Sequence, residues 1–387
     1  GGLGQVQAGQ YAGYLWPMGP FHALGDLLGL APWVVHRLWL GTLLALAAWG
    51  VVRLLDALLH RRRGAAHLVA GALLIANPYV VVFANRTSVT LLAYALLPWL
   101  LLAVHRGLRD PRGWLWPAAV ALLVTSLGGG VNAAVAAWVL LGPALLIAYD
   151  GWLGEVSWRD AGRFLARALP LTALASAWWL APILVQVGNG VDFLPFTEPA
   201  GAIWTSTSMS ESLRLMGFWV AYLGVGYGSQ LAPVFDSAPT LLGSAPLIVA
   251  GFAIPGLAIA GFAWTRRWRY GPFFAALALL GLLVMFTGFP DGAPLRRALH
   301  WSYDRFELVR FLRTTYKAGP LLALALACLG GAAAGLAWER LRGRTVAAAA
   351  ATVAAAALLV AWSLPLWEGR AVDGEIAFDE VPAGWER

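Results

Sequence analysis

The feature that most constrains this chain is a series of long apolar runs, each close to the length of a membrane-spanning helix. A helix needs roughly 20 mostly apolar residues to cross a bilayer, and about ten runs approach that length. They cover residues 36–58, 67–84, 88–105, 114–127, 131–149, 164–187, 241–264, 272–288, 318–337 and 345–366. Charged residues make up only 12% of the chain, about half the share in soluble domains. Because backbone polar groups in lipid must bond to one another, we expect an all-α polytopic membrane protein, with external amphipathic loop helices.

Five basic loops follow alternate runs and predict the orientation of the chain. Their sequences are HRRRG, RGLRDPRG, WRDAGR, TRRWR and ERLRGR. Simple alternation places all five on one side, which the positive-inside bias identifies as cytoplasmic. Both termini and the long connections 188–240 and 289–317 then lie on the external side of a plasma membrane. The net charge of +7 thus indicates topology rather than a nucleic-acid partner.

The chain starts GGLGQVQAGQ, without an initiator methionine or the apolar core of a signal peptide. We therefore expect a piece of a longer protein, in which residues 1–387 form one membrane domain and residues 1–35 end the first external loop. The one cysteine, Cys328, lies inside an apolar run. A single cysteine excludes both an internal disulfide and a cysteine metal cluster.

Three cations lie together on the predicted external side, against the bias of the other loops. In FELVRFLRTTYKAG, residues 306–319, the spacing of Phe306, Arg310, Arg313 and Lys317 is i, i+4, i+7 and i+11. On a helix these residues would share one face. Three cations beside a bilayer predict a binding site for a lipid phosphate, to which arginine offers a bidentate fork. The alternative is that these long side chains only snorkel to the membrane border.

The other long connection contains SMSESLRLMGFW, residues 208–219, which predicts an interfacial helix. Ser208 or Ser210 can cap it. Its apolar side would consist of Leu213, Met216 and Val220. Glu211 and Arg214 are three residues apart and are expected to pair. That pair either belongs to a surface helix or contacts a substrate, and the sequence leaves both open.

A transferase that acts on a sugar hydroxyl needs a carboxylate within hydrogen-bond reach to take its proton. Several external carboxylates qualify by position. They are Asp26, Asp192, Glu198, Glu211, Asp236, Asp291, Asp304 and Glu307. The pattern does not choose among them, because exposed carboxylates are mostly just solvated. The chain has no HExxH, Walker or Rossmann motif, and no ligand cluster decides whether a divalent metal takes part.

External aromatic side chains have two interpretations, as membrane-border anchors or as surfaces that hold a sugar. They include Trp16, Trp204, Trp219, Trp301, Tyr303 and Tyr316. Within the apolar runs, ionisable residues are scarce, and no series of midplane carboxylates indicates an ion-coupled transporter.

Three stretches resemble a known family. GQYAGYLWPMGPF, residues 9–21, together with SMSESLRLMGFW and FLRTTYKAG, resembles the membrane region of the actinobacterial alpha-(1→3)-arabinofuranosyltransferases. These look like GT-C glycosyltransferases, multi-span helical enzymes that take a sugar from a polyprenyl phosphate on the external face. The resemblance implies decaprenylphosphoryl arabinose as donor, cell-wall arabinan as acceptor, and inversion in one displacement.

The resemblance also assigns roles to residues. Arg310, Arg313 and Lys317 suit the departing donor phosphate. A substrate groove would involve Tyr11, Tyr14, Trp16, Glu211 and Arg214, although a packed re-entrant loop explains the first three almost as well. The catalytic base of such enzymes is usually in the first external loop, so we expect it upstream of residue 1. Asp26, Glu211 and Asp304 are the weak candidates within this chain.

Other functions fit the same pattern. A GT-C enzyme for another sugar, such as mannose, is the first alternative. A transporter or flippase of lipid-linked sugars would use the same cations without chemistry, but should show polar groups continuing through the bilayer. A non-catalytic scaffold for other cell-wall enzymes would tolerate loss of every external charge. The expected partners are a polyprenyl phosphate-linked donor, a polysaccharide acceptor and membrane lipids, with no certain cofactor.

Overall fold

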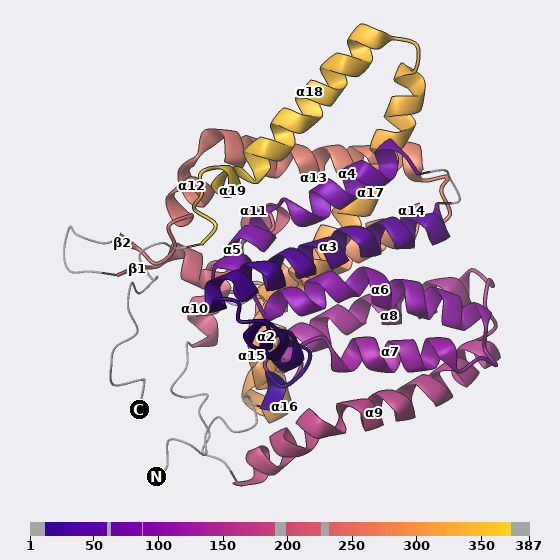
Figure 1. Ribbon diagram of the computed structural model, residues 1–387, viewed down its shortest axis with the longest axis vertical. Helices are drawn as coiled ribbons and strands as arrows, with labels where there is room; N and C mark the ends of the chain where they lie inside the picture. Colours follow the sequence, from indigo (N-terminus) through magenta and orange to yellow (C-terminus); the bar gives the residue numbers. More distant parts are fainter. Residues whose placement is uncertain (1–11, 60–62, 87, 190–198, 226–231, 373–387) are drawn as a thin grey trace.

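The computed structural model describes residues 12–59, 63–86, 88–189, 199–225 and 232–372. Within these ranges the chain is a bundle of helices, most of which run nearly side by side, with α18 projecting obliquely at the top and further short helices gathered at one end (Figure 1). The helices of the bundle are α3 (Pro32–Leu58), α4 (Ala65–Ile75), α5 (Pro78–Arg86), α6 (Thr90–Arg109), α7 (Leu115–Thr125), α8 (Ala133–Trp152), α9 (Trp158–Asn189), α13 (Ala245–Thr265), α14 (Gly271–Phe286), α17 (Gly319–Leu341) and α18 (Thr345–Trp362).

The short elements mostly lie outside the bundle core. They are α2 (Met18–Leu27), α10 (Ala200–Thr205), α11 (Met209–Leu213), η3 (Trp219–Tyr222), β1 (Gly224–Val225), β2 (Ala232–Pro233), α12 (Ala238–Gly243), α15 (Pro294–Arg305), α16 (Glu307–Arg310), η4 (Phe311–Arg313), η5 (Thr315–Ala318) and α19 (Leu364–Trp367). The two strands pair antiparallel, with Gly224 opposite Pro233 and Val225 opposite Ala232.

The expected all-α polytopic architecture is confirmed, and each expected run contains a helix. The count of about ten spans is not confirmed. Among the described residues, seven helices are long and apolar enough to cross a membrane, or eight if the bent pair α4 and α5 is one span. The helices α7 and α14 are apolar but shorter, with 11 and 16 residues.

The run expected at 67–84 is broken rather than continuous. Asn77 precedes Pro78, which disfavours helical geometry at the residue before it, and the two halves meet at an angle of 41°. The side chain of Asn77 bonds across the break, because its Nδ2 donates to the carbonyl of Leu74 at 2.9 Å and to the hydroxyl of Tyr94 at 2.8 Å. Its Oδ1 accepts from the backbone N–H of Val80 at 3.2 Å. The break is therefore a built feature whose backbone groups are satisfied within the protein.

Helix α17 lies at the centre and packs against α4, α13 and α14. Its close approach to α4 requires a glycine, since a Cβ on Gly331 would lie 2.5 Å from the carbonyl oxygen of Ala66. Small residues at such contacts let helix backbones approach closely in a bilayer, where packing rather than the hydrophobic effect drives association. The apolar core of the bundle is thus organised around α17.

The described parts of the five basic loops lie toward one end of the bundle, at the right and upper right in Figure 1. Arg109 of the second loop binds Asp150 at 3.1 Å and the hydroxyl of Tyr270 at 2.8 Å. The indole of Trp268 donates to the carbonyl of Leu58 at 2.8 Å, which joins the fourth loop to the end of α3. Arg340 of the fifth loop makes a cation–π contact with Trp264, directly before the fourth loop, with its guanidinium carbon 4.9 Å from the ring centre. The short elements α10 to α12 lie at the opposite end (Figure 1).

Candidate functional site

Arg310, Arg313 and Lys317 lie at the end of the bundle opposite the basic loops. The prediction that they share one face of a continuous helix is wrong. Phe306 has an extended backbone, α16 is only four residues long, and two 3₁₀ segments follow it. The backbone of Thr314 (φ −84°, ψ 66°) interrupts any helix between Arg313 and Lys317. The β-branched pair Thr314 and Thr315 disfavours an α-helix there, and Thr315 instead donates its hydroxyl to the carbonyl of Met285 at 3.0 Å.

Arg313 and Lys317 are nonetheless close in the chain and nearly buried, with 8% and 9% of their surface exposed. Arg310, one turn earlier, is half-buried. A nearly buried cation is costly and persists only where partner groups or a bound anion offset the loss of water. These residues directly precede α17, so they lie at the border of the central span. The position of the cations suits an anionic group that reaches the protein from the membrane.

Trp204 fixes the backbone at Arg313. Its indole N–H donates to the carbonyl of Arg313 at 2.9 Å, and its ring is fully buried. The ring packs onto Gly288, where a Cβ would lie 2.3 Å from Trp204 Cγ. Because α10 supplies Trp204, the connection 188–240 directly positions a residue of the connection 289–317. This residue was expected only as an anchor or a sugar surface.

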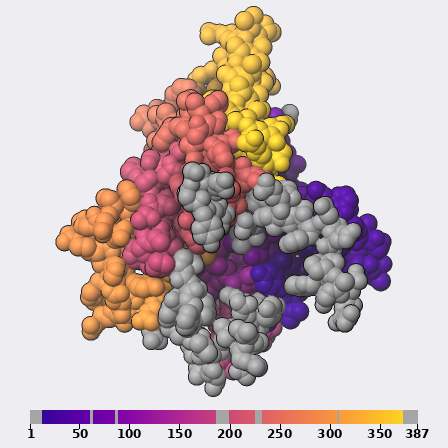
Figure 2. All heavy atoms as spheres, turned by 90° about the vertical axis from the view of Figure 1, so that its left-hand side faces the viewer, coloured from indigo at the N-terminus to yellow at the C-terminus, as the bar shows by residue number. Residues whose placement is uncertain are grey.

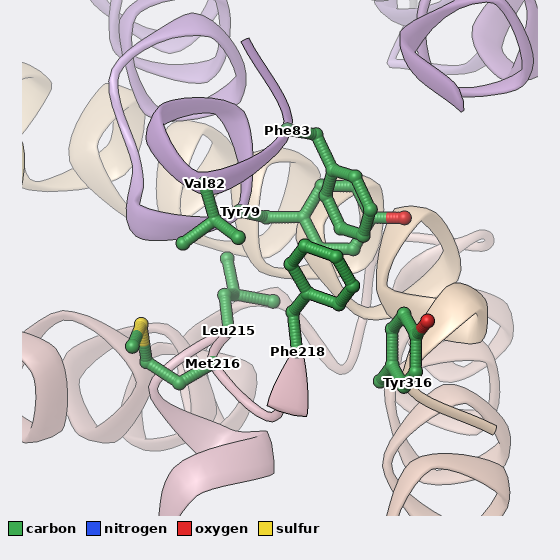
Figure 3. A pocket seen from close by; sticks show the side chains of 7 residues that line it. All are labelled: Tyr79, Val82, Phe83, Leu215, Met216, Phe218 and Tyr316. Carbon is green, nitrogen blue, oxygen red and sulfur yellow. The ribbon is translucent and has the colours of Figure 1, made fainter. Parts of the chain in front are cut away.

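An aromatic crevice adjoins these cations, and Figure 3 shows its lining. Its residues are Tyr79, Val82, Phe83, Leu215, Met216, Phe218 and Tyr316. Its lining side chains pack so closely that the crevice has no room for a water molecule. Ring centroids lie 5.0 Å apart for Phe83 and Phe218 and 5.2 Å apart for Phe218 and Tyr316, so aromatic contact runs from α5 to η5.

Two hydroxyls point to the same side of this crevice, those of Tyr79 and Tyr316 (Figure 3). The hydroxyl of Tyr79 is buried and has no hydrogen-bond partner among the residues described. Lys317 lies next to Tyr316 in the chain, with its ammonium 5.7 Å from the centre of that ring. A buried polar atom without a partner is uncommon in folded proteins and calls for an explanation such as a ligand. The crevice therefore joins polar groups to apolar walls at the membrane border.

The expected pair Glu211–Arg214 is confirmed, but in a buried setting. Arg214 donates to Glu211 Oε1 at 2.8 Å and to the carbonyl of Leu241 at 2.8 Å. Glu211 Oε2 accepts from the hydroxyl of Tyr222. Burial first, and the Glu211 charge second, raise the pKa of Tyr222 above its ordinary value. Both oxygens of Glu211 thus have protein partners, as expected for a residue that holds α11, η3 and α12 together.

The interfacial helix expected over 208–219 is wrong in its extent. Ser208 caps α11 as expected, since its hydroxyl accepts from the N–H of Glu211 at 3.2 Å. The helix ends at Leu213 after five residues, and Leu215 has a positive φ of 62°. Met216, expected on an apolar membrane face, is instead buried in the core beside the crevice. The apolar side of this segment therefore faces the protein and not the bilayer.

Of the expected groove residues, Tyr14 and Trp16 lie at the start of the described chain, and Tyr11 lies outside it. Trp16 donates its indole N–H to the hydroxyl of Ser126 at 2.8 Å, and part of each ring remains exposed. The segment approaches the turn between α7 and α8 so closely that a Cβ on Gly13 would lie 2.3 Å from a backbone atom of Gly130. The N-terminal stretch is therefore packed onto the bundle, with its aromatic rings at the surface.

The weak base candidates lie in different places. Asp26 is exposed near the end of α2. Asp304 is exposed on α15, where it binds His300 at 2.8 Å. Two further carboxylates, Asp192 and Glu198, lie outside the described residues. In the described ranges no three His, Cys, Asp or Glu side chains gather to hold a metal ion, so a role for a divalent metal stays a prediction.

Sequence reasoning missed two polar clusters within the helices. One is the Asn77–Tyr94 contact at the helix break, for which Asn-Pro was the available signal. The other surrounds Asp150, which is fully buried and bonded to Arg109 and Tyr270. Burial first, and the Asp150 charge second, raise the pKa of Tyr270 to about 12. The signal for this cluster was a lone aspartate at the end of an apolar run.

The fold, together with Arg310, Arg313 and Lys317 beside the aromatic crevice, defines a multi-pass helical membrane protein with basic loops at one end and a cationic, aromatic site at the other. A family model described as the N-terminal GT-C domain of alpha-(1→3)-arabinofuranosyltransferase matches residues 1–387, and the chain belongs to this family.

Known relatives agree with this family. The alpha-(1→3)-arabinofuranosyltransferase of Mycobacterium tuberculosis is 30% identical in an alignment of 402 residues that covers 99% of this chain and 27% of that protein. That of Mycolicibacterium smegmatis is 29% identical over 325 residues, 84% of this chain and 22% of its own. A cryo-EM structure of the mycobacterial arabinofuranosyltransferase AftD superposes with a TM-score of 0.70 at 27% identity, covering 98% of this chain and 24% of that one. The chain thus spans about a quarter of the length of the relatives it matches.

Proposed function

We propose that this domain serves an enzyme that transfers arabinofuranose from decaprenylphosphoryl arabinose to cell-wall arabinan on the external face of the plasma membrane. Family membership over the whole chain supports the transferase class. The observation that carries the proposal is the position of Arg313 and Lys317, nearly buried at the end of the bundle opposite the basic loops. The positive-inside bias favours the cytoplasm for the basic end, and hence the exterior for this one.

Arg310, Arg313 and Lys317 would bind the phosphate of the donor. The guanidinium of arginine can bind two phosphate oxygens at once, and lysine adds a point charge. In a partly dehydrated site such charges favour the departing phosphate more strongly than they would in water. The apolar crevice beside them, lined by Phe83 and Phe218, would face the first part of the polyprenyl chain. Arg313 and Lys317 precede the start of α17, at the border of the central span, which supports this arrangement.

The reaction is a single displacement. The acceptor hydroxyl oxygen attacks C1 of the arabinofuranose, while the bond from C1 to the phosphate oxygen breaks and its electron pair leaves with the phosphate. A carboxylate takes the proton of the hydroxyl. Attack from the side opposite the phosphate inverts the configuration at C1. We propose that this carboxylate lies upstream of residue 1, and that Tyr14 and Trp16 line the sugar or acceptor groove. Asp26, Glu211 and Asp304 stay weaker candidates for the base.

The test is transfer of labelled arabinose from decaprenylphosphoryl arabinose to a short arabinan by the full-length protein in detergent. We expect transfer by the parent and a loss of at least about 100-fold in the double variant Arg313→Gln, Lys317→Gln, since hydrogen bonds to charged groups contribute about 1.5 to 3 kcal/mol each. The matched control is Arg342→Gln, Arg344→Gln, which removes two exposed cations at the basic end. Equal activity in both variants would contradict the assignment of the phosphate site.

The same protein in vesicles separates the alternatives. A parent that transfers mannose and not arabinose belongs to another GT-C specificity. A parent that moves lipid-linked sugar between leaflets and transfers none is a flippase. Retention of cell-wall synthesis in cells that carry only the Arg313, Lys317 double variant would favour a scaffold.

A further inference from the structure

Helix α15 (Pro294–Arg305) faces the protein with the side that carries Arg296, Leu299 and Tyr303. Arg296, His300 and Tyr303 are spaced i, i+4 and i+7 and therefore share one face. All three contact the ring of Trp204. The guanidinium of Arg296 lies 5.6 Å from the ring centre, and the rings of His300 and Tyr303 lie 6.0 and 6.2 Å from it.

The opposite side of α15 leaves apolar rings uncovered. Trp301 is 59% exposed, and Phe306, directly after the helix, is 48% exposed. The rings of Trp301 and Phe306 meet edge to face, with centroids 5.8 Å apart. No residue of the helix is buried. Exposed apolar clusters on a protein usually mark a contact with a partner or a membrane.

The place of α15 in the fold selects a membrane as that partner. It follows α14, which ends at Phe286, and leads through η5 into α17, which begins at Gly319. Both helices are apolar, so this connection starts and ends at the membrane border. Figure 2 looks at the bundle from this end, and the orange segment that contains α15 projects sideways beyond the other helices. A helix that projects sideways at the membrane border lies over lipid.

The charges on the outer side of α15 fit anionic lipid headgroups. Arg297 and Arg305 are exposed, and Arg305 lies one turn from Trp301. The exposed carboxylate of Asp304 is bound to His300 at 2.8 Å. Aromatic rings at headgroup depth with arginines beside them are typical of interfacial helices.

We propose that α15 is a membrane-surface anchor. Trp301 and Phe306 insert into the border of the leaflet at the cationic end, while Arg297 and Arg305, one turn before and one turn after Trp301, bind the phosphates of anionic phospholipids. Because Trp204 contacts α15 and also holds the carbonyl of Arg313, this anchor is joined directly to the cationic cluster. The proposal concerns lipid contact alone and stands whether or not the domain transfers arabinose.

Spin-label accessibility in the full-length protein tests the orientation of the helix. Cys328 is fully buried, and other reactive cysteines of the full-length protein would be replaced. Single labels are placed through Trp301→Cys, Phe306→Cys and, as a control in the exposed loop at the basic end, Arg342→Cys, in nanodiscs of phosphatidylcholine with about one third phosphatidylglycerol, a composition that supplies anionic headgroups. Labels at 301 and 306 should collide more often with apolar oxygen than with a water-soluble nickel complex, and the label at 342 should show the reverse.

Two other outcomes would overturn the anchor. Strong collision of the labels at 301 and 306 with nickel would place α15 in water. Weak collision of both labels with both reagents would show that protein covers this side instead of lipid.

A second measurement tests the lipid charge. With Arg297→Gln and Arg305→Gln in the protein labelled at 301, the label should move toward water in the mixed nanodiscs. In pure phosphatidylcholine the same changes should have little effect. The control pair Arg342→Gln, Arg344→Gln lies at the other end and should leave the label unchanged. An equal effect in both lipids would overturn the preference for anionic headgroups.

Discussion

Trp204 donates its indole N–H to the carbonyl oxygen of Arg313 across 109 residues of sequence, at 2.9 Å. This bond ties the two long connections together at the point where the cations meet the central helix. We expect Trp204→Phe to keep the ring but remove this hydrogen bond, at a cost of about 1 kcal/mol in the free energy of unfolding.

The loss would be measured as a lower midpoint of thermal unfolding in detergent, and as a higher KM for the lipid donor. Trp152→Phe is the matched control, because Trp152 is largely exposed at the basic end. A normal KM together with lower thermal stability would show that the bond supports the fold without placing Arg313.

Glu211 should tolerate loss of its charge better than a catalytic base would. Because Arg214 and Tyr222 occupy its two oxygens, we expect Glu211→Gln to lower arabinose transfer by less than about tenfold. A general base contributes about 10²- to 10⁴-fold, so a loss beyond 100-fold with a changed pH profile would identify Glu211 as the base. The readout is kcat as a function of pH for the variant and the parent.

The buried Asp150–Arg109 pair should be far more sensitive than an exposed pair. Removing one partner of a buried pair leaves an uncompensated charge and costs about 3 to 5 kcal/mol. We expect a value near the lower end for Asp150→Ala, because a third of the Arg109 side chain is exposed. The control is Asp160→Ala, whose pair with Arg163 is partly exposed and should contribute at most about 1 kcal/mol. Equal shifts in the unfolding midpoint would contradict this difference.

The raised pKa of Tyr270 predicts a pH dependence of stability. Its phenol donates to Asp150 Oδ1 at 3.1 Å and keeps its proton up to about pH 12, whereas an unfolded tyrosine loses it near pH 10. The folded state therefore holds more protons between these values, and stability falls as pH rises through them. The difference in unfolding midpoint between the parent and Tyr270→Phe should be full below pH 10 and shrink toward pH 12. A constant difference across this range would contradict the shift.

The sequence predicted the class and the approximate limits of the helices because apolar length alone decides what can cross a bilayer. It could not predict which prolines break a helix. Pro98 and Pro143 lie inside continuous helices, whereas Pro78 follows a break that depends on contacts of Asn77 with Tyr94, 17 residues away.

The sequence proposed residues for the candidate site but did not predict their geometry. Regular spacing placed Arg310, Arg313 and Lys317 on one helical face, but Thr315 bonds to Met285, 30 residues away, and the helix breaks beside it. Trp204 and Tyr79 gain their importance only from neighbours that are distant in sequence. Local spacing carries no information about such contacts.

Binding of decaprenyl phosphate, the group that leaves in the proposed reaction, tests the central claim most directly. It would be titrated against the full-length protein in detergent, with the parent, Arg313→Gln, Lys317→Gln and the control Arg342→Gln. Each site variant should raise the Kd by at least about tenfold, the equivalent of 1.4 kcal/mol, while the control should match the parent. Unchanged Kd values in properly folded site variants would show that the donor phosphate binds elsewhere.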